Sequence, residues 1–262
     1  LVFISMRFEI ADKKKRDIFV HIFHYLKNFT DAIVMNIDPS RLYIQGMDNS
    51  HICVYELSLD SSWFETWEVE DTYTCGLCLP VLNKILNICS DKQTILIHSE
   101  NDEDLEIDFT SDEKGEFNKY LKMPLMDITV DMLQIPDMEY DVDIEMDSKK
   151  FKGIIDELSN FNEALNITCD ENQVVMESSS SEGAMKVVIE IDDIELLAIV
   201  EGKELNASFG IKYIAQMSQF HKVSSNCMLH LTENMPLQLK YVLDDACMMR
   251  FYLAPKINDD DD

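Results

Sequence analysis

The segment Phe19-Val-His-Ile-Phe-His-Tyr-Leu-Lys-Asn-Phe-Thr-Asp-Ala32 has a counterpart later in the chain, Phe151-Lys-Gly-Ile-Ile-Asp-Glu-Leu-Ser-Asn-Phe-Asn-Glu-Ala164. In both segments, apolar residues recur at the i, i+3, i+4 spacing of a helix that buries one face. The two segments also share Phe, Leu, the dipeptide Asn-Phe and Ala at matching places. A constant shift of this kind, from Phe19 to Phe151, predicts an internal duplication.

The shift that carries Phe19 onto Phe151 extends over most of the chain without a gap. It superposes a second pair of amphipathic segments, which begin at Leu79 and Ile211, so each repeat is predicted to carry two helices. We therefore predict two equal domains, 1–123 and 141–262, with an interdomain connector at 124–140 and an acidic tail at the end of the second domain. Further matches under this shift are His98 with His230, Leu105 with Leu237, and Tyr120-Leu121 with Tyr252-Leu253.

Alternating or β-branched runs fill the rest of each repeat and outnumber the helices. Such runs are typical of strands that are half buried. The prediction is an α+β fold in which each domain contains antiparallel sheet, with two helices packed on one face of it. The predicted strands are 41–44, 52–59, 94–98, 105–109, 187–191, 196–200 and 237–242.

The connector at 124–140 (PLMDITVDMLQIPDMEY) has no counterpart inside a repeat and contains prolines at positions 124 and 136. It is rich in Leu, Ile and Met, which a fully solvated linker would not be. We expect it to lie along a surface or to present a binding site.

The formal net charge of −28, from 50 acidic and 22 basic residues, argues against a nucleic-acid binder because phosphate contacts need Lys and Arg. The basic residues are nevertheless concentrated at the four predicted helices. If the apolar helix faces pack on the sheets, the opposite faces form a positive surface that would bind phosphates without reading bases. The alternative is that Lys is simply common on solvated helix faces. The residues predicted to face DNA are Lys13, Lys14, Lys15, Arg16, Lys27, Lys84, Lys149, Lys150, Lys152, Lys212 and Lys222.

No pattern in the sequence supports catalysis, a metal site or a cofactor site. Cys75-Gly-Leu-Cys78 has zinc or redox spacing, but no second ligand pair completes a site, and His21 with His24 fits a polar helix face better than a ligand set. There is no glycine-rich phosphate loop. No apolar run approaches the ~18 residues of a membrane span, and seven scattered cysteines favour reduced thiols. We predict a soluble intracellular protein that is not an enzyme.

Four motifs occur in a specific order: Gln45-Gly-Met-Asp-Asn-Ser-His51, Leu125-Met-Asp127, Leu133-Gln-Ile-Pro136 with Glu139-Tyr140, and Phe251-Tyr-Leu-Ala-Pro-Lys-Ile257. With these motifs the chain resembles the eukaryotic and archaeal DNA sliding clamps, the proliferating cell nuclear antigen family, from Met6 to its end. The resemblance implies two clamp domains with sheets outside and helices inside, closed into a homotrimeric ring around double-stranded DNA. It implies a processivity factor for DNA replication and repair, in the nucleus or at a viral replication site.

The resemblance also implies protein partners: a clamp loader, DNA polymerase and other proteins that carry a PIP-box peptide. Such a peptide would dock an apolar plug under the connector; the alternative is that the pocket residues are ordinary core. Ring closure would pair an edge strand around 116–123 with one around 185–191 of the neighbouring subunit. The implied pocket comprises Met47, His51, Val54, Leu133, Ile135, Tyr140, Pro236, Tyr252, Leu253, Ala254 and Pro255.

The chain departs from the family pattern at two places. The lysine that the family modifies, just after the cysteine matching Cys169, is replaced by acids near Asp170-Glu171. On the helices, positions that are usually basic in the family are neutral or acidic here, which implies weaker DNA contact or contact shifted to other lysines; they are Asn87, Gly153, Asp156 and Gln219.

Two alternatives to a homotrimeric clamp stay open: a monomeric or heteromeric clamp-like processivity or checkpoint factor, and a DNA-independent protein scaffold.

Overall fold

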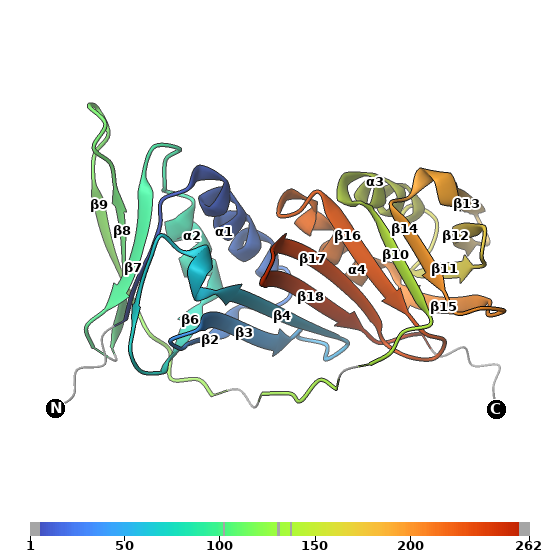
Figure 1. The fold of residues 1–262 in the computed structure, drawn as a ribbon, viewed down its shortest axis with the longest axis horizontal. Helices are drawn as coiled ribbons and strands as arrows, with labels where there is room; N and C mark the ends of the chain where they lie inside the picture. The colour runs from blue at the N-terminus through green and yellow to red at the C-terminus, as the bar shows by residue number, and fades with distance from the viewer. Residues whose placement is uncertain (1–5, 102, 130–131, 137, 257–262) are drawn as a thin grey trace. The chain divides into compact units, whose positions relative to one another are not determined.

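The structure is a computed structural model of the chain and describes residues 6–101, 103–129, 132–136 and 138–256. It divides into two compact units, each built of strands and helices (Figure 1). Each unit includes a short segment from the other half of the sequence. Unit 1 contains Leu1–Asn49, Glu56–Leu133 and Leu243–Met248, and unit 2 contains Ser50–Tyr55, Gln134–Val242 and Met249–Asp262.

The first repeat contributes nine strands: β1 (Met6–Ile10), β2 (Ala32–Ile37), β3 (Arg41–Met47), β4 (Cys53–Asp60), β5 (Thr66–Val69), β6 (Tyr73–Cys78), β7 (Thr94–Ser99), β8 (Asp104–Thr110) and β9 (Lys119–Pro124). One sheet has the order β5-β1-β7-β8-β9, and a second contains the run β4-β3-β2-β6. β7 and β8 bury every second residue, as strands with one face on a core do.

The helices of the first repeat are α1 (Lys13–Leu26) and α2 (Leu79–Leu86), which pack against each other. α1 begins after Asp12, whose carboxylate accepts a hydrogen bond from the backbone N–H of Lys15 at 2.9 Å, a favourable N-cap. α2 carries Pro80 in its first turn, where the missing N–H costs nothing. The large apolar residues that α1 buries follow the spacing seen in the sequence; they are Ile18, Phe19, Ile22, Phe23, Tyr25 and Leu26.

The second repeat repeats this plan with β10 (Val142–Asp147), β11 (Ala164–Cys169), β12 (Gln173–Ser180), β13 (Gly183–Glu190), β14 (Leu196–Ile199), β15 (Leu205–Gly210), β16 (Asn226–Leu231), β17 (Leu237–Asp244) and β18 (Cys247–Leu253). One sheet has the order β13-β12-β11-β15, and the other contains the run β14-β10-β16-β17-β18. Its helices are α3 (Ser148–Leu158) and α4 (Ile211–Ser218). Short 3-10 helices are η1 (Ser61–Trp63), η2 (Ile191–Asp193) and η3 (Gln219–Lys222).

Aromatic side chains fill the core of both units. In unit 1 the rings of Phe19 and Phe23 lie 4.8 Å apart, edge to face. In unit 2 the rings of Phe220 and Phe251 lie 4.9 Å apart, and the fully buried hydroxyl of Tyr241 donates to the carbonyl of Met217 at 3.0 Å. Burial of each such side chain stabilises its unit by about 1.5–3 kcal/mol.

The two repeats match closely but not without gaps. The shift that carries Phe19 onto Phe151 relates β2 to β11, β6 to β15, α2 to α4, and β7 to β16, whereas η1 and β5 match η2 and β14 only at a slightly smaller shift. The expectation of a gapless match was therefore wrong in this region. The cause is the turn before the fourth strand of each repeat: β12 and β13 join through a tight hairpin, with Ser180 paired to Gly183, while 48–52 separate β3 from β4.

The α+β prediction is confirmed, with antiparallel sheets and two helices in each repeat. Strands outside the predicted set are β1, β2, β5 and β6 in the first repeat and β10, β11, β12, β15, β16 and β18 in the second. β9 lies close to the edge strand that the resemblance implied around 116–123. All seven cysteines are free thiols, and burial raises the pKa of Cys75 to about 12. Among the described residues, no helix is both long enough and apolar enough to cross a membrane.

Candidate nucleic-acid interface and partner surfaces

Both repeats place lysines at the N-terminus of their first helix. Lys13 and Lys14 are exposed in the first turn of α1, and Lys149 and Lys150 are exposed in the first turn of α3. Cations at this end of a helix oppose the helix dipole and destabilise the helix slightly. Neither first turn contains an acid, and only the N-cap carboxylates of Asp12 and Asp147 offset the charge. Helix stability therefore does not explain these lysines.

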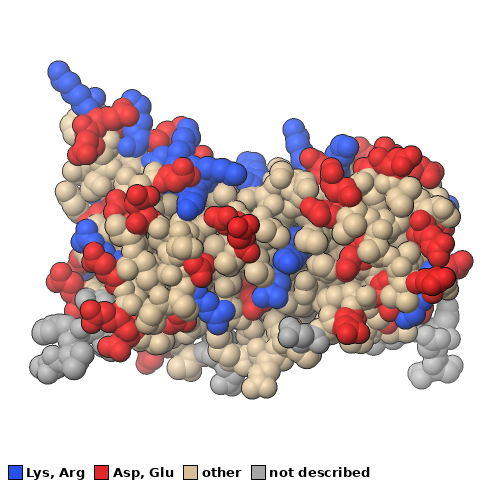
Figure 2. All heavy atoms as spheres, in the orientation of Figure 1, with Lys and Arg blue, Asp and Glu red and all other residues tan. Residues whose placement is uncertain are grey.

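Figure 2 shows basic side chains gathered over α1, while acidic side chains spread over strands and loops of the same face. Of the residues predicted to face DNA, seven are exposed and have no ion pair to a described residue. The ammonium of Lys212 also lies 4.9 Å from the ring of Tyr213. The seven are Lys14, Lys27, Lys84, Lys149, Lys150, Lys212 and Lys222.

Arg16 was predicted to face DNA, and this is wrong because its side chain points into unit 1. It is 5% exposed, and its Nη2 donates to the backbone carbonyl of Asp91 at 2.6 Å. Lys15 is half buried, and its Nζ donates to the carbonyl of Trp63 at 2.8 Å and lies over the Trp63 ring. These hydrogen bonds connect α1 to η1 through Lys15 and to the segment around Asp91 through Arg16, within unit 1.

Two further lysines of this set are already ion-paired. In unit 1, Nζ of Lys13 lies 2.9 Å from Oδ2 of Asp91, and the hydrogen bond raises the pKa of Lys13 and lowers that of Asp91. In unit 2, Lys152 pairs with Asp156 one helical turn later in α3. These pairs place acids among the cations of the helix surfaces.

Two departures from basic residues, Asn87 and Gln219, have local structural explanations, whereas nothing in the structure explains Gly153. The amide of Asn87 donates to the carbonyl of Asn83 at 2.8 Å and completes the end of α2. Gln219 similarly reaches the carbonyl of Ala215 at 3.4 Å. Gly153 is exposed on α3, with open space where a Cβ would stand.

The first part of the connector is fixed to unit 1 by main-chain contacts. The N–H of Met126 donates to the carbonyl of Gly76 at 2.8 Å. A Cβ on Gly76 would stand 2.4 Å from the Met126 oxygen and from Ile128, so only glycine allows this approach. The side chain of buried Gln45 holds Leu133 at both backbone groups, at 2.7 and 3.1 Å. The motifs that begin at Gln45 and Leu133 therefore act together.

Tyr140, at the end of the connector, is held within unit 2. Its ring lies 5.3 Å from the ring of His230, and its hydroxyl accepts a hydrogen bond from Gln238 at 3.3 Å. Burial raises its pKa to about 12. In the same unit, the N–H of Ala254 donates to the carbonyl of Ile52 at 3.2 Å, which brings the chain end beside the loop before β4.

The residues of the implied peptide pocket are distributed between the units. In unit 1, Met47 and Leu133 are 37% and 39% exposed. In unit 2, Leu253 has no exposed surface, so its prediction as a lining residue is wrong: it belongs to the core. Tyr252 is also buried, at 7% exposed. The remaining predicted residues of unit 2 are exposed or half-buried: His51, Val54, Ile135, Tyr140, Pro236, Ala254 and Pro255.

Equivalent strands of the two repeats differ in burial. β4 is buried along most of its length, and hydrogen bonds at or next to its two ends involve residues at or next to the ends of β18. In unit 1 the N–H of Asp60 donates to Sγ of Cys247, and in unit 2 Ile52, just before β4, accepts from Ala254, just after β18. β13, the equivalent of β4, lies at a sheet edge and exposes every second residue, including Val188 at 47%. β9, the equivalent of β18, is also an edge strand, with Tyr120 70% exposed.

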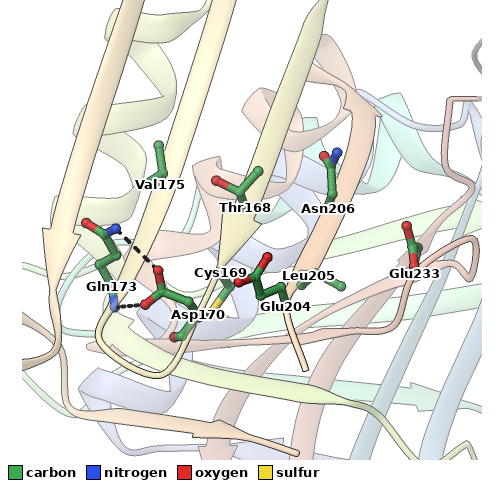
Figure 3. Close-up of a pocket in the computed structure, with 9 residues that line it drawn as sticks. All are labelled: Thr168, Cys169, Asp170, Gln173, Val175, Glu204, Leu205, Asn206 and Glu233. Carbon is green, nitrogen blue, oxygen red and sulfur yellow. Dashed lines mark hydrogen bonds between the residues drawn. The ribbon is translucent and has the colours of Figure 1, made fainter. Parts of the chain in front are cut away.

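A hollow of about 410 Å³ opens in unit 2 beside the ends of β11 and β15 (Figure 3). Asp170 accepts hydrogen bonds from the backbone and side chain of Gln173, drawn in Figure 3, and so closes the turn after β11. Burial raises the pKa of the Cys169 thiol to about 11, which makes it a poor nucleophile. Among the described residues that line the hollow there is no histidine or lysine; they are Thr168, Cys169, Asp170, Gln173, Val175, Glu204, Leu205, Asn206 and Glu233.

Comparisons with known proteins agree with this geometry. The family model "Proliferating cell nuclear antigen, N-terminal domain" matches residues 8–132, and the corresponding C-terminal domain model matches residues 134–256. Proliferating cell nuclear antigen of Caenorhabditis elegans is 28% identical over 242 residues, covering 90% of this chain and 92% of the relative. Proliferating cell nuclear antigen 2 of Drosophila melanogaster is 27% identical over 244 residues, covering 90% and 95%. The crystal structure of the Entamoeba histolytica protein has the same fold, with a TM-score of 0.86, 22% identity and coverage of 96% and 99%.

Proposed function

Because the chain belongs to the proliferating cell nuclear antigen family of DNA sliding clamps, we propose that it encircles double-stranded DNA as a homotrimeric ring and tethers replication and repair proteins. Membership of the family supports a role as a processivity factor in DNA replication and repair, and we propose that the chain acts there as a non-enzymatic scaffold. The ring, its DNA contacts and its partners are the parts that we propose.

The contrast between β4 and β13 carries the proposal of a ring. Within the chain, the last strand of the second repeat, β18, meets β4 of the first. β9 is the equivalent of β18, and β13 is the equivalent of β4, so β9 and β13 are expected to pair in the same way. Both are instead exposed edge strands. Edge strands with exposed apolar residues favour pairing with another chain. A head-to-tail contact of β9 on β13 of a second copy would satisfy both edges, and three such contacts would close a ring.

The exposed lysines support contact with phosphates. Their repetition at α1 and α3 would present each repeat to DNA in the same way, as a ring of repeated domains requires. Lysine contacts to phosphates carry no base information, so the protein could move along any sequence. We propose Lys14, Lys27, Lys84, Lys149, Lys150, Lys212 and Lys222 as the contacting residues, with Lys13 and Lys152 held back by their ion pairs.

We further propose that PIP-box peptides of DNA polymerase and other clients dock on the surface near the connector. Exposed apolar residues support this, since an unpartnered apolar surface favours protein contact. The exposed apolar members of the implied set are the first candidates for contact with the peptide: Met47 and Leu133 in unit 1 and Ala254 in unit 2. A clamp loader to open the ring, a nuclear location, and domain boundaries at 1–123, 124–140 and 141–262 complete the proposal.

Retention on DNA of controlled topology tests this function. The protein is mixed with bead-bound linear duplex, the free end is then blocked by a bulky protein, and the beads are washed in high salt. A ring is retained on the blocked duplex and lost after the duplex is cut, because salt weakens phosphate contacts but cannot release a closed ring. Equal loss from blocked and open duplexes would contradict the proposal and favour an open clamp or a scaffold.

A further inference from the structure

Each repeat holds one lysine of its helix surface in an ion pair, Lys13 with Asp91 and Lys152 with Asp156. We propose that Asp91 and Asp156 are intramolecular counter-ions that compete with DNA phosphates for these lysines and so weaken the grip on DNA. This inference rests on the proposed function, because it assumes that the helix surfaces meet DNA. It assigns a role in tuning DNA affinity to two acids.

The position of Asp91 is fixed independently of its carboxylate. The buried guanidinium of Arg16 binds the backbone carbonyl of Asp91 at 2.6 Å. The carboxylate of Asp91 is therefore held within reach of Lys13, 2.9 Å away, although the two side chains are 79% and 59% exposed. Exposed pairs of this kind contribute little to stability. A role in folding does not explain why an acid is anchored beside this lysine.

The pair in unit 2 is also a poor device for stabilising its helix. Lys152 precedes Asp156 by four residues, the less favourable order for an ion pair along a helix. Asp156 stands in the second half of α3, where a negative charge opposes the helix dipole. The family resemblance implied a basic residue at this position, so the acid both removes one cation and occupies a second.

The expected size of the effect follows from counter-ion release. Each phosphate that a lysine neutralises adds about 0.9 to the slope of log affinity against log salt. Freeing one lysine therefore steepens the slope by about 0.9. Over the tenfold change from 1 M to 0.1 M salt, the affinity of the variant for DNA then rises about eightfold more than that of the wild type. The weaker grip of the native protein would favour movement along the duplex.

The test is the association of the full chain with a fluorescent 30-base-pair duplex, followed by anisotropy between about 0.05 and 0.2 M salt, where phosphate contacts lose most affinity. Asp91→Asn removes the charge but keeps the backbone carbonyl that Arg16 binds. Asp156→Asn is the independent variant in unit 2. Asp127→Asn, an exposed acid of the connector, is the matched control for net charge. Lys13→Ala alone and with Asp91→Asn completes a double-mutant cycle.

The proposal predicts about fivefold to tenfold tighter binding at 0.1 M salt for both Asp→Asn variants, a steeper salt slope, and no change for the control. It also predicts that Lys13→Ala abolishes the gain in the Asp91→Asn background. If the wild type binds and Lys84→Ala weakens it, but neither Asp→Asn variant changes affinity or slope, the counter-ion role is overturned while the proposed function stands. If the wild type shows no salt-sensitive association, the DNA-binding part of the proposed function fails, and the counter-ion role with it.

Discussion

The two repeats use the same strand in opposite ways. β4 of the first repeat is covered along its length and meets β18 at both ends, whereas β13 of the second repeat leaves an exposed edge. The exposed β9 and the buried β18 show the same contrast. Because the repeats share one fold, the fold does not cause the difference. One strand pair is completed within the chain, whereas the equivalent pair is left open, and there we propose that a second copy binds.

Elsewhere the repeats solve the same problem in the same way. The chain leaves the first repeat with Met126 bonded to the carbonyl of Gly76, and it leaves the second with Lys256 bonded to the carbonyl of Ser208. Gly76 and Ser208 occupy matching places in equivalent strands, β6 and β15. The hydrogen bond at which the chain leaves each repeat is therefore common to both repeats, whereas the burial of the edge strands differs between them.

Breaking the open edge should have the largest effect. Val188→Asp puts a charge on the exposed side of β13, where burial against another chain would be costly, and we expect complete conversion of the assembly to single chains. Light scattering measures this directly. Val242→Asp is the matched control, because Val242 is 42% exposed and belongs to β17, a central strand of a different sheet. An assembly that survives Val188→Asp would mean that β13 is not the contact.

Removing equivalent core rings should cost both repeats equally. Phe19 and Phe151 occupy matching places in α1 and α3, and neither has exposed surface. Replacement of either by Ala should lower the free energy of unfolding by about 3–5 kcal/mol. Denaturant unfolding at fixed protein concentration measures the loss. If only one of the two variants lost less than about 1 kcal/mol of unfolding free energy, the two rings would not contribute equally to stability.

Glycine is needed at only one of the two equivalent exits. Gly76→Ala would bring a Cβ to 2.4 Å from the Met126 oxygen, and displacement of the connector should cost about 1–3 kcal/mol of stability. Ser208→Ala leaves the Cβ and the carbonyl in place, so it should change stability by less than about 0.5 kcal/mol. Thermal unfolding of the two variants decides the matter, and equal losses would contradict the explanation.

The smallest effect concerns the turns closed by Asp38 and Asp170, which are equivalent residues of the two repeats. For Asp38, burial raises the pKa, but hydrogen bonds from Ser40 and Arg41 outweigh it; for Asp170, the backbone N–H of Asn172 lowers the pKa most. A lowered folded pKa means that the ionised carboxylate stabilises the protein above the ordinary value of 3.8 and that this contribution disappears as pH falls through the folded pKa.

Wild type and Asp170→Asn should therefore differ in Tm near neutral pH and converge in acid. Asp38→Asn should behave in the same way, because its turn has the same hydrogen bonds. A difference that persists or grows below pH 3.8 would show that the charge of these carboxylates is not what stabilises the turns.

Much of this plan could be read from the sequence, because burial is periodic. The spacing around Phe19 and Phe151 predicted α1 and α3, and the constant shift predicted two repeats. The short strand β6 was missed because it is buried over most of its length and so lacks alternation. Part of the difference in length between the repeats was missed because it lies in the turn before the fourth strand, where no apolar period records it. The rest lies at the start of the first helix, which has 14 residues in α1 and 11 in α3.

At the surface, the sequence predicted which residues are basic but not where each side chain points. Arg16 follows three lysines in one run, yet its side chain is buried and its guanidinium donates a hydrogen bond to the carbonyl of Asp91. Asp91 was not singled out, since only the fold brings its loop to the start of α1. The helical spacing could have separated Arg16 from the lysines, because Arg16 lies three residues before Phe19 and so falls on the apolar face of the helix.

We propose that a second copy of the chain completes the open edges of β9 and β13. The most direct measurement is the absolute molar mass of the protein by light scattering across a dilution series. A closed trimer would have three times the chain mass of 30.3 kDa, and we expect this mass to be maintained on dilution. A stable species of 30.3 kDa at all concentrations would contradict it, because both edges would then stay exposed in the native protein.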